Sequence, residues 1–116
     1  MTLPRKSRLS DKNDFEMVFK QGKTVKSSFF FIKFLKNSFN YPRIAISLPI
    51  KISKKATQRN IIKRKISAAA SDLIDDYKNK SLDLIIVATP TILGKSSEEI
   101  KSVLEKNIKE IFVNDK

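Results

Sequence analysis

Residues 82–89 read Leu-Asp-Leu-Ile-Ile-Val-Ala-Thr, and this stretch decides the fold. Its apolar residues 84–88 follow one another without alternation, which is typical of a strand covered on both faces. The chain on either side predicts a helix, over about 56–77 before the strand and from Ser96 after it. The centre of the protein is therefore expected to be a buried strand with helices packed against its sheet.

Both flanking helices have an apolar stripe at helical spacing. In the helix over 56–77 the stripe consists of Ile62, Ile66, Ala69, Ala70, Leu73 and Tyr77. The opposite side of its helical wheel holds Asn60, Lys63, Arg64 and Ser67. The last helix opens with Ser96 and Glu99 in capping-box spacing, and its stripe consists of Ile100, Val103, Leu104, Ile108, Ile111 and Phe112. These stripes predict two helices that each bury one face.

Toward the N-terminus the sequence predicts two more strands and a short helix. The strands cover about 28–35 and 43–48, with a turn over 37–42 between them. In the first strand one face is assigned to the core (Phe30, Ile32, Phe34) and the other holds Phe29, Phe31, Lys33 and Leu35. In the second strand the small Ala45 and Ser47 share a face and leave room for a ligand. The helix has Ser10 as its cap, Gly22 as its end and an apolar stripe of Phe15, Val18 and Phe19.

The predicted element order is α-β-β-α-β-α. This order predicts an α+β two-layer sandwich, in which helices cover a small, mostly antiparallel sheet and one helix crosses between strands, as in the second domain of a ribosomal protein. A chain of 116 residues is the size of one domain. We expect a single domain over 1–116, with residues 1–8 forming a basic N-terminal arm.

The composition excludes several kinds of chemistry. The chain has no cysteine and no histidine, so it offers no disulfide, no thiolate zinc site and no histidine base, and we expect no catalytic residue and no protein-bound metal. No apolar run approaches the ~18 residues that a membrane span needs. No signal peptide is visible at the N-terminus. The sequence predicts a soluble cytoplasmic protein without a membrane partner.

Positive charge is concentrated in the first part of the chain. The formal net charge is +12, and residues 1–65 hold 17 Lys or Arg against three acids. Residues 66–116 hold seven Lys or Arg against nine acids. A regional excess of this size favours a surface for nucleic acid or acidic lipid over a solvated basic face, although the solvated face stays open as an alternative.

The densest cluster of cations precedes and opens the helix over 56–77. It consists of Lys51, Lys54, Lys55, Arg59, Lys63, Arg64 and Lys65, with no acid among them. Cations oppose the dipole at a helix N-terminus, whereas the other two helices have acids at their starts. Bound phosphates would explain this arrangement, because free N–H groups and cationic side chains would surround them together. Asn60 adds an amide that can pair with a base edge or a 2′-hydroxyl.

The same segment carries a family resemblance. Arg59-Asn60-Ile61-Ile62-Lys63-Arg64 resembles the Arg-Asn-Arg-x-Lys-Arg signature of the bacterial ribonuclease P protein subunit. The stretches 8–9, 14–22, 43–47 and 83–87 also resemble the family pattern in order and spacing. Ile61 departs from it, since the family usually has a second Arg there. Pro49-Ile50-Lys51 also departs from it, since the family often has two Lys after the second strand.

The resemblance implies an RNA-binding domain without catalytic activity of its own. Such proteins bind a large catalytic RNA that holds the reactive Mg²⁺ ions, and the holoenzyme removes the 5′ leader of precursor tRNA as an endonuclease. The residues implied in docking on the catalytic RNA are Lys51, Lys54, Lys55, Arg59, Asn60, Lys63, Arg64 and Lys65. The residues implied in binding the leader are Arg8, Phe15, Phe19, Phe31 and Lys33. DNA is not an expected partner.

Two other functions stay open at this point. One is a ribosomal or other structural RNA-binding protein with no role in cleavage, and the other is a metal-dependent nuclease that works alone. Asp72 and Asp75 lie one helical turn apart and could bind a metal ion weakly, but a solvated helix end explains them better. Gly94-Lys95-Ser96 superficially suggests a phosphate loop, yet Thr89 stands where such a loop needs its first glycine.

Overall fold

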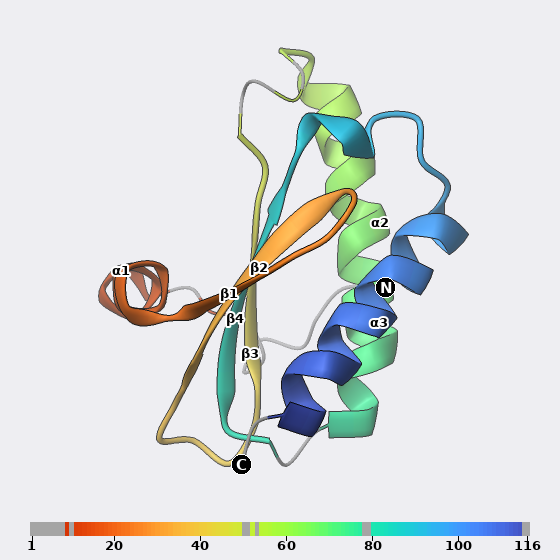
Figure 1. Cartoon of the computed structure of the whole chain (residues 1–116). Helices are drawn as coiled ribbons and strands as arrows, with labels where there is room; N and C mark the ends of the chain where they lie inside the picture. The colour runs from red at the N-terminus through yellow and green to blue at the C-terminus, as the bar shows by residue number, and fades with distance from the viewer. Residues whose placement is uncertain (1–8, 10, 50–51, 53, 78–79, 115–116) are drawn as a thin grey trace.

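The computed structural model describes residues 9, 11–49, 52, 54–77 and 80–114, without the side chains of 113 and 114. In these ranges the elements follow the order α1 (Lys12–Gln21), β1 (Lys23–Lys26), β2 (Phe30–Lys36), β3 (Arg43–Ser47), α2 (Ala56–Ile74), a 3₁₀ turn (Asp75–Tyr77), β4 (Leu82–Ala88), a second 3₁₀ turn (Pro90–Ile92) and α3 (Ser97–Asn114). Figure 1 shows the sheet in the centre, with α1 on one side and α2 and α3 on the other.

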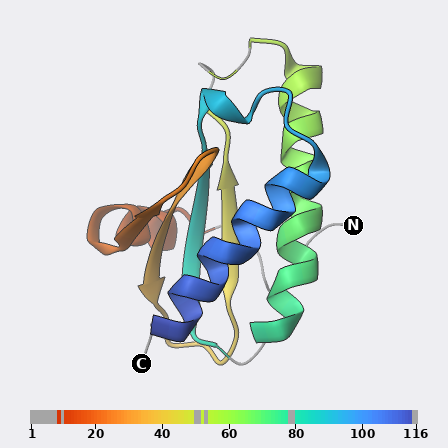
Figure 2. The same cartoon turned by 45° about the vertical axis from the view of Figure 1, so that its right-hand side comes forward.

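The sheet confirms the predicted α+β class. Its four strands have the order β1-β2-β4-β3, with antiparallel pairing of β1 with β2 and of β2 with β4 and parallel pairing of β3 with β4. The connection between the parallel strands runs through α2, which is the predicted crossover helix. The sheet and the pair α2 and α3 form the two main layers, and α1 lies across the opposite face (Figure 2).

Buried side chains form one large and one small cluster. The large one fills the space between the sheet and α2 and α3, and it includes Phe30, Ile32, Ile66 and Leu104. The small one lies under α1 and consists of Leu9, Val18, Ile85 and Val87. Every residue of β4 is buried, and its apolar side chains enter the two clusters from opposite faces of the strand. This confirms the expected strand covered on both faces, although it ends at Ala88 and not at residue 89.

The sequence prediction missed β1, so the observed order is α-β-β-β-α-β-α. The strand Lys-Thr-Val-Lys has one apolar side chain, Val25, which pairs with Ile32 of β2 and packs on the large cluster. Four residues at a sheet edge bury too little to produce a readable alternation. Smaller corrections concern ends: β2 begins at Phe30 and not at 28, β3 ends at Ser47, and α2 gives way to a 3₁₀ turn at Asp75.

The starts of α1 and α3 are capped in two different ways. The N-cap of α1 is Asp11, whose Oδ1 accepts hydrogen bonds from the backbone N–H groups of Asn13 and Asp14 at 2.8 and 3.2 Å. The predicted cap, Ser10, was therefore wrong by one residue, and Ser10 itself lies outside the described residues. The capping box of α3 is confirmed, because Ser96 Oγ accepts from the N–H of Glu99 and Glu99 Oε1 accepts from the N–H of Ser96.

Gly22 ends α1 as predicted, but its conformation is extended backbone that any residue adopts, with φ −73° and ψ 158°. The reason for glycine is space. A Cβ at this position would lie 2.4 Å from the carbonyl oxygen of Val18 and 2.7 Å from that of Phe34. The end of α1 thus lies directly against β2, which fixes where the helix crosses the sheet.

Gly22→Ala is expected to destabilise the protein by about 1–3 kcal/mol, the usual cost of overpacking a tight contact. The added methyl group would meet two backbone carbonyl oxygens, and backbone cannot turn aside as a flexible side chain does. Urea denaturation would measure the change. Gly94→Ala is a suitable comparison, because its Cβ would meet nothing within 4 Å and its cost would come only from the positive φ of 78°. An unchanged midpoint for Gly22→Ala would contradict the close approach.

Candidate nucleic-acid interface

The start of α2 is positively charged and differs from the starts of the other two helices. Its N-cap is Lys55, which makes no side-chain capping hydrogen bond, and its first turn contains no acid. In contrast, α1 has Asp11 and Asp14 at its start, and α3 has Glu98 and Glu99. The difference predicted from sequence is therefore present in the folded protein. In Figure 1 this start lies at the end of the sheet where β3 and β4 finish.

Most of the predicted docking residues lie at the surface of this segment. The exposed ones are Lys54, Lys55, Asn60, Lys63 and Arg64, while Arg59 is half-buried. Ile61, at the position of the usual second Arg of the family signature, is 51% exposed. The helix thus presents cations, an amide and one apolar side chain to the solvent, and its buried side faces the large core cluster.

Two predicted residues of this group need separate mention. Lys65 is half-buried, and its Nζ donates a hydrogen bond to the carbonyl oxygen of Lys95 at 3.0 Å, which ties α2 to the loop before α3. Its ammonium therefore has a contact within the protein that the sequence did not indicate. Lys51 lies outside the described residues, as does Arg8 of the predicted leader site.

Three of the predicted leader-binding residues meet beside α1. The rings of Phe15 and Phe19 stack with centroids 6.1 Å apart and an angle of 24° between their planes. Lys33 of β2 places its Nζ 5.0 Å from the centroid of Phe19. Phe15, Glu16, Phe19 and Lys20 line a surface hollow of about 300 Å³. Phe19 is 41% exposed, so one ring of the pair is accessible to a partner.

Phe31, the fourth predicted leader-binding residue that the structure describes, belongs to β2 and not to α1. It is half-buried and packs against the small cluster under α1. The strand register places it in a row that crosses all four strands on the α1 side, made of Lys26, Phe31, Val87 and Ser47. The sequence could not reveal this row, because its members come from four strands and one of those strands was not foreseen.

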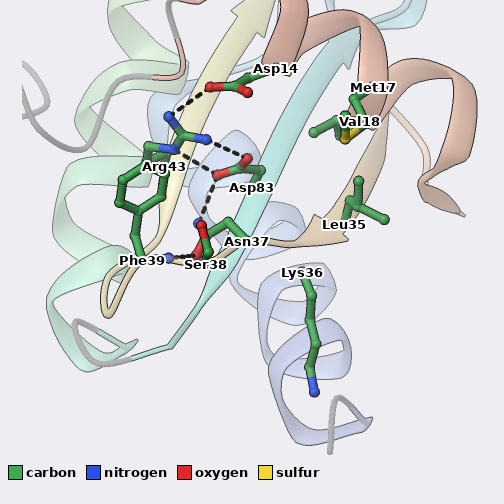
Figure 3. A pocket seen from close by; sticks show the side chains of 10 residues that line it. All are labelled: Asp14, Met17, Val18, Leu35, Lys36, Asn37, Ser38, Phe39, Arg43 and Asp83. Carbon is green, nitrogen blue, oxygen red and sulfur yellow. Dashed lines mark hydrogen bonds and ion pairs between the residues drawn. The ribbon is translucent and has the colours of Figure 1, made fainter.

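An ion-pair network fixes the start of α1 on the sheet (Figure 3). Arg43 of β3 donates from Nε and Nη2 to the two carboxylate oxygens of Asp83 at 2.8 and 2.7 Å. Its Nη1 lies 3.2 Å from Asp14 Oδ2 on α1. Asn37 Nδ2 also donates to Asp83, at 2.8 Å. The hydrogen bond to Asp83 raises the pKa of the Arg43 guanidinium further above its ordinary value, so this side chain stays positively charged.

The network lines a second hollow, of about 350 Å³, on the other flank of α1. Its apolar lining consists of Met17, Val18, Leu35 and Phe39, and Figure 3 shows Met17 beside Val18 on one side and Phe39 beside Arg43 on the other. The guanidinium carbon of Arg43 lies 4.4 Å from the centroid of the Phe39 ring. Sequence reasoning did not single out this hollow, since Arg43 and Asp83 belong to different strands and look like solvated charges in the sequence.

Among the described residues, no group of three or more His, Cys, Asp or Glu side chains is placed to hold a metal ion. Asp72, considered above as a weak ligand, lies 3.3 Å from the ammonium of Lys101. None of the described helices has the length and apolar character needed to span a membrane.

Known proteins are similar to this chain over nearly its whole length. The family model described as Ribonuclease P matches residues 3–111. The ribonuclease P protein component of Synechocystis is 33% identical over 107 residues, covering 91% of this chain and 86% of that protein. The ribonuclease P protein component of Thermotoga maritima is 31% identical over 113 residues, covering 95% and 89%.

Solved structures of RNase P proteins have the same fold as this chain. The Staphylococcus aureus RNase P protein superposes with a TM-score of 0.78 at 25% identity, covering 94% of this chain and 98% of that one. The RNase P protein from Thermotoga maritima gives 0.64 at 29% identity, covering 92% of each chain. The chain therefore belongs to the ribonuclease P protein family and is the protein subunit of that tRNA-processing endonuclease.

Proposed function

We propose that this protein binds the catalytic RNA of ribonuclease P through the start of α2 and binds the 5′ leader of precursor tRNA beside α1. In this proposal it works in the cytoplasm, the RNA subunit holds the Mg²⁺ ions and carries out the cleavage, and the protein positions the substrate. The observation that carries the proposal is the start of α2, where cations are exposed, the first turn contains no acid, and the N-cap residue Lys55 makes no side-chain capping hydrogen bond.

Electrostatics supports RNA docking at α2. Each cation near a helix N-terminus costs about 0.3–1 kcal/mol when exposed, and neighbouring like charges add to that cost. A phosphate backbone reverses the sign of these contributions, because it can accept from backbone N–H groups at a helix start and pairs with the ammonium and guanidinium groups. The docking residues in this proposal are Lys51, Lys54, Lys55, Arg59, Asn60, Lys63, Arg64 and Lys65, of which Lys65 also holds the loop before α3.

Aromatic exposure supports leader binding on the other side of the sheet. The Phe19 ring lies beside the ammonium of Lys33 and stacks on Phe15, and Phe31 is half-buried on the sheet. Unpaired bases stack on such rings with about 1–3 kcal/mol each and with little sequence preference. Leaders differ in sequence from one tRNA to another, and a stacking surface with adjacent positive charge tolerates that variation.

A cleavage assay with the reconstituted holoenzyme tests the proposal. The protein alone should leave precursor tRNA intact, and its addition to the catalytic RNA at low Mg²⁺ should restore cleavage at the 5′ end of the mature tRNA. Cleavage by the protein alone would instead identify a metal-dependent nuclease. An unchanged activity of the catalytic RNA would contradict the proposal and favour a structural RNA-binding protein.

Lys55 allows stability and RNA binding to be separated. Its backbone already has the extended N-cap conformation, with φ −82° and ψ 119°. Lys55→Asn and Lys55→Asp would each supply the missing cap and are expected to raise the free energy of unfolding by about 0.5–2 kcal/mol. Both should weaken binding to the catalytic RNA, Lys55→Asp more strongly, because the local charge changes by one and by two units.

Urea denaturation and titration with the catalytic RNA are carried out on the unmodified protein, Lys55→Asn and Lys55→Asp. Lys106→Glu on the exposed side of α3 is the control, since it makes the same change of net charge as Lys55→Asp away from α2. Increased stability with unchanged RNA affinity would show that Lys55 at the start of α2 does not serve RNA binding.

A further inference from the structure

The loop before α3, residues 89–96, lies beside the first half of α2 (Figures 1 and 2). Near its start, Thr91 Oγ1 donates a hydrogen bond to the carbonyl oxygen of Ser28 at 2.6 Å. At its end, Lys65 Nζ of α2 donates to the carbonyl oxygen of Lys95 at 3.0 Å, and the capping box of α3 begins at Ser96. The loop is thus tied to the sheet at one end and to α2 at the other, which fixes its position beside the helix.

The tie through Lys65 leaves the charge of this side chain unbalanced. A carbonyl oxygen accepts a hydrogen bond but carries no net charge. Among the described residues, neither Lys65 nor Lys95 forms an ion pair with a carboxylate. An ammonium has three N–H donors, and the bond to the loop uses one of them. Two donors and the whole positive charge of Lys65 therefore remain for an anionic partner.

An aromatic ring holds the side chain of Lys95. Its Nζ lies 5.2 Å from the centroid of the Phe29 ring, at the end of the sheet where β2 begins. The face of a ring attracts a cation, and such a contact contributes about 0.5–1 kcal/mol at an exposed site. The ring positions the ammonium but does not neutralise it. Lys95 is therefore a second positioned cation, on an element that the basic run in front of and within α2 does not include.

Lys65 connects Lys95 with the exposed side of α2. An α-helix turns by about 100° per residue, so Lys63, Arg64 and Lys65 point in successive directions around the helix axis. The first two are exposed, and the third is on the side that contacts the loop. A band of positive charge therefore runs from the exposed side of α2 through Lys65 to Lys95. The sequence did not indicate this band, because its last two members are 30 residues apart.

We infer that the catalytic RNA contacts the loop before α3 as well as α2, with a phosphate at the ammonium of Lys95 and with Lys65 as the residue that positions the loop. This inference rests on the proposed function, in which α2 and the segment before it provide the docking surface. An RNA backbone fits the band because it repeats a negative charge at short intervals and can contact cations on two neighbouring elements at once. The band ends at the start of α3, where Glu98 and Glu99 would repel phosphates.

Titration of the catalytic RNA at several salt concentrations tests the contact with the loop. Lys95→Gln removes the charge, keeps most of the aliphatic stem beside Phe29 and retains the backbone carbonyl that Lys65 contacts. It should weaken binding about two- to fivefold and lower the salt slope by roughly 0.7–0.9, the value for one phosphate. Lys80→Gln is the matched control, because Lys80 is an exposed loop lysine beyond the other end of α2.

A double-mutant cycle tests the positioning role of Lys65. Lys65→Met should weaken RNA binding more than Lys95→Gln does, because it removes one cation and releases the loop that holds another. When Lys65→Met is already present, Lys95→Gln should cost less than about twofold, since the released loop no longer brings its ammonium to a phosphate. Lys65→Arg keeps a charged donor and should retain most of the affinity. A tie with a purely structural role would change stability and leave RNA affinity and salt slope as they are.

The possible outcomes separate this inference from the proposed function. Unchanged affinity and salt slope for Lys95→Gln, or the same loss with Lys80→Gln, would overturn the contact with the loop. If RNA binding still fell on substitution of Lys63 and Arg64, docking on α2 would stand without the loop. If neither substitution affected RNA binding, the proposed docking surface would fail together with the inference. An equal cost of Lys95→Gln with and without Lys65→Met would overturn the positioning role of Lys65.

Discussion

Replacing Lys63 and Arg64 together by alanine is expected to weaken binding of the catalytic RNA at least tenfold and to lower its salt slope by about 1.5. Both side chains are exposed on α2. If each neutralises one phosphate, its loss removes roughly 0.7–0.9 of a released counterion from the slope. The adjacent core positions Ile62 and Ile66 are untouched, and alanine favours the helix, so the thermal midpoint should not fall.

The measurement is a titration of the catalytic RNA at several salt concentrations, with the double variant Lys106→Ala and Lys109→Ala as control. These two lysines are exposed on α3. Their loss lowers the net charge by the same amount without touching α2. If both double variants changed the slope equally, the attraction would come from net charge alone and α2 would not be the docking surface. An unchanged slope for the α2 variant would likewise contradict the proposal.

Much of the fold was readable because burial leaves a pattern in the sequence. The unbroken run 84–88 indicated a strand covered on both faces, and each face indeed meets its own core cluster. The stripe on α2 was equally clear, since Ile62, Ile66 and Leu73 are all buried. Wherever many apolar side chains share one face, the pattern predicts the element and the side that it buries.

The parts that escaped prediction depend on contacts between distant residues. Asp14 and Asp83 belong to the family-like stretches, yet nothing in their spacing shows that one arginine joins them. The tie between Lys65 and the carbonyl of Lys95 is invisible for the same reason, because a lysine in a basic run looks solvated. The partner of a charged side chain depends on the strand register and on the packing of distant segments. Neither can be read from the local sequence around that side chain.

In the candidate site, too, the local feature was predictable from the sequence and the feature that depends on distant contacts was not. The cationic start of α2 was predicted because it is local, and it violates a local rule that the other two helices obey. The leader site with Phe15 and Phe19 was predicted only by family resemblance, since two phenylalanines at helical spacing could equally have been core residues. The structure exposes one ring and half-buries the other, an outcome set by where Gly22 and Asp14 fix the helix.

Phe19→Ala is expected to weaken precursor tRNA binding about tenfold or more while leaving the affinity for mature tRNA unchanged, since a stacked base is worth about 1–3 kcal/mol. The ring is 41% exposed and contacts Phe15 and Lys33, so its removal opens no cavity in either core cluster. Alanine also has the higher helix propensity, and the thermal midpoint should stay the same. Binding of both tRNAs to the reconstituted holoenzyme, together with thermal unfolding, measures these effects.

Substitution of Phe19 is a clearer test of leader binding than substitution of Phe31. Phe31→Ala should also lower precursor affinity, but its half-buried ring packs on the cluster under α1, so stability would fall with it. Phe39→Ala is the matched control for Phe19→Ala, because Phe39 is 38% exposed and lines the hollow on the other flank of α1. Equal losses of precursor affinity in the two variants would mean that exposed aromatic surface binds RNA without selection. A loss confined to Phe19, absent for mature tRNA, would mean that this flank of α1 distinguishes a tRNA that still has its leader.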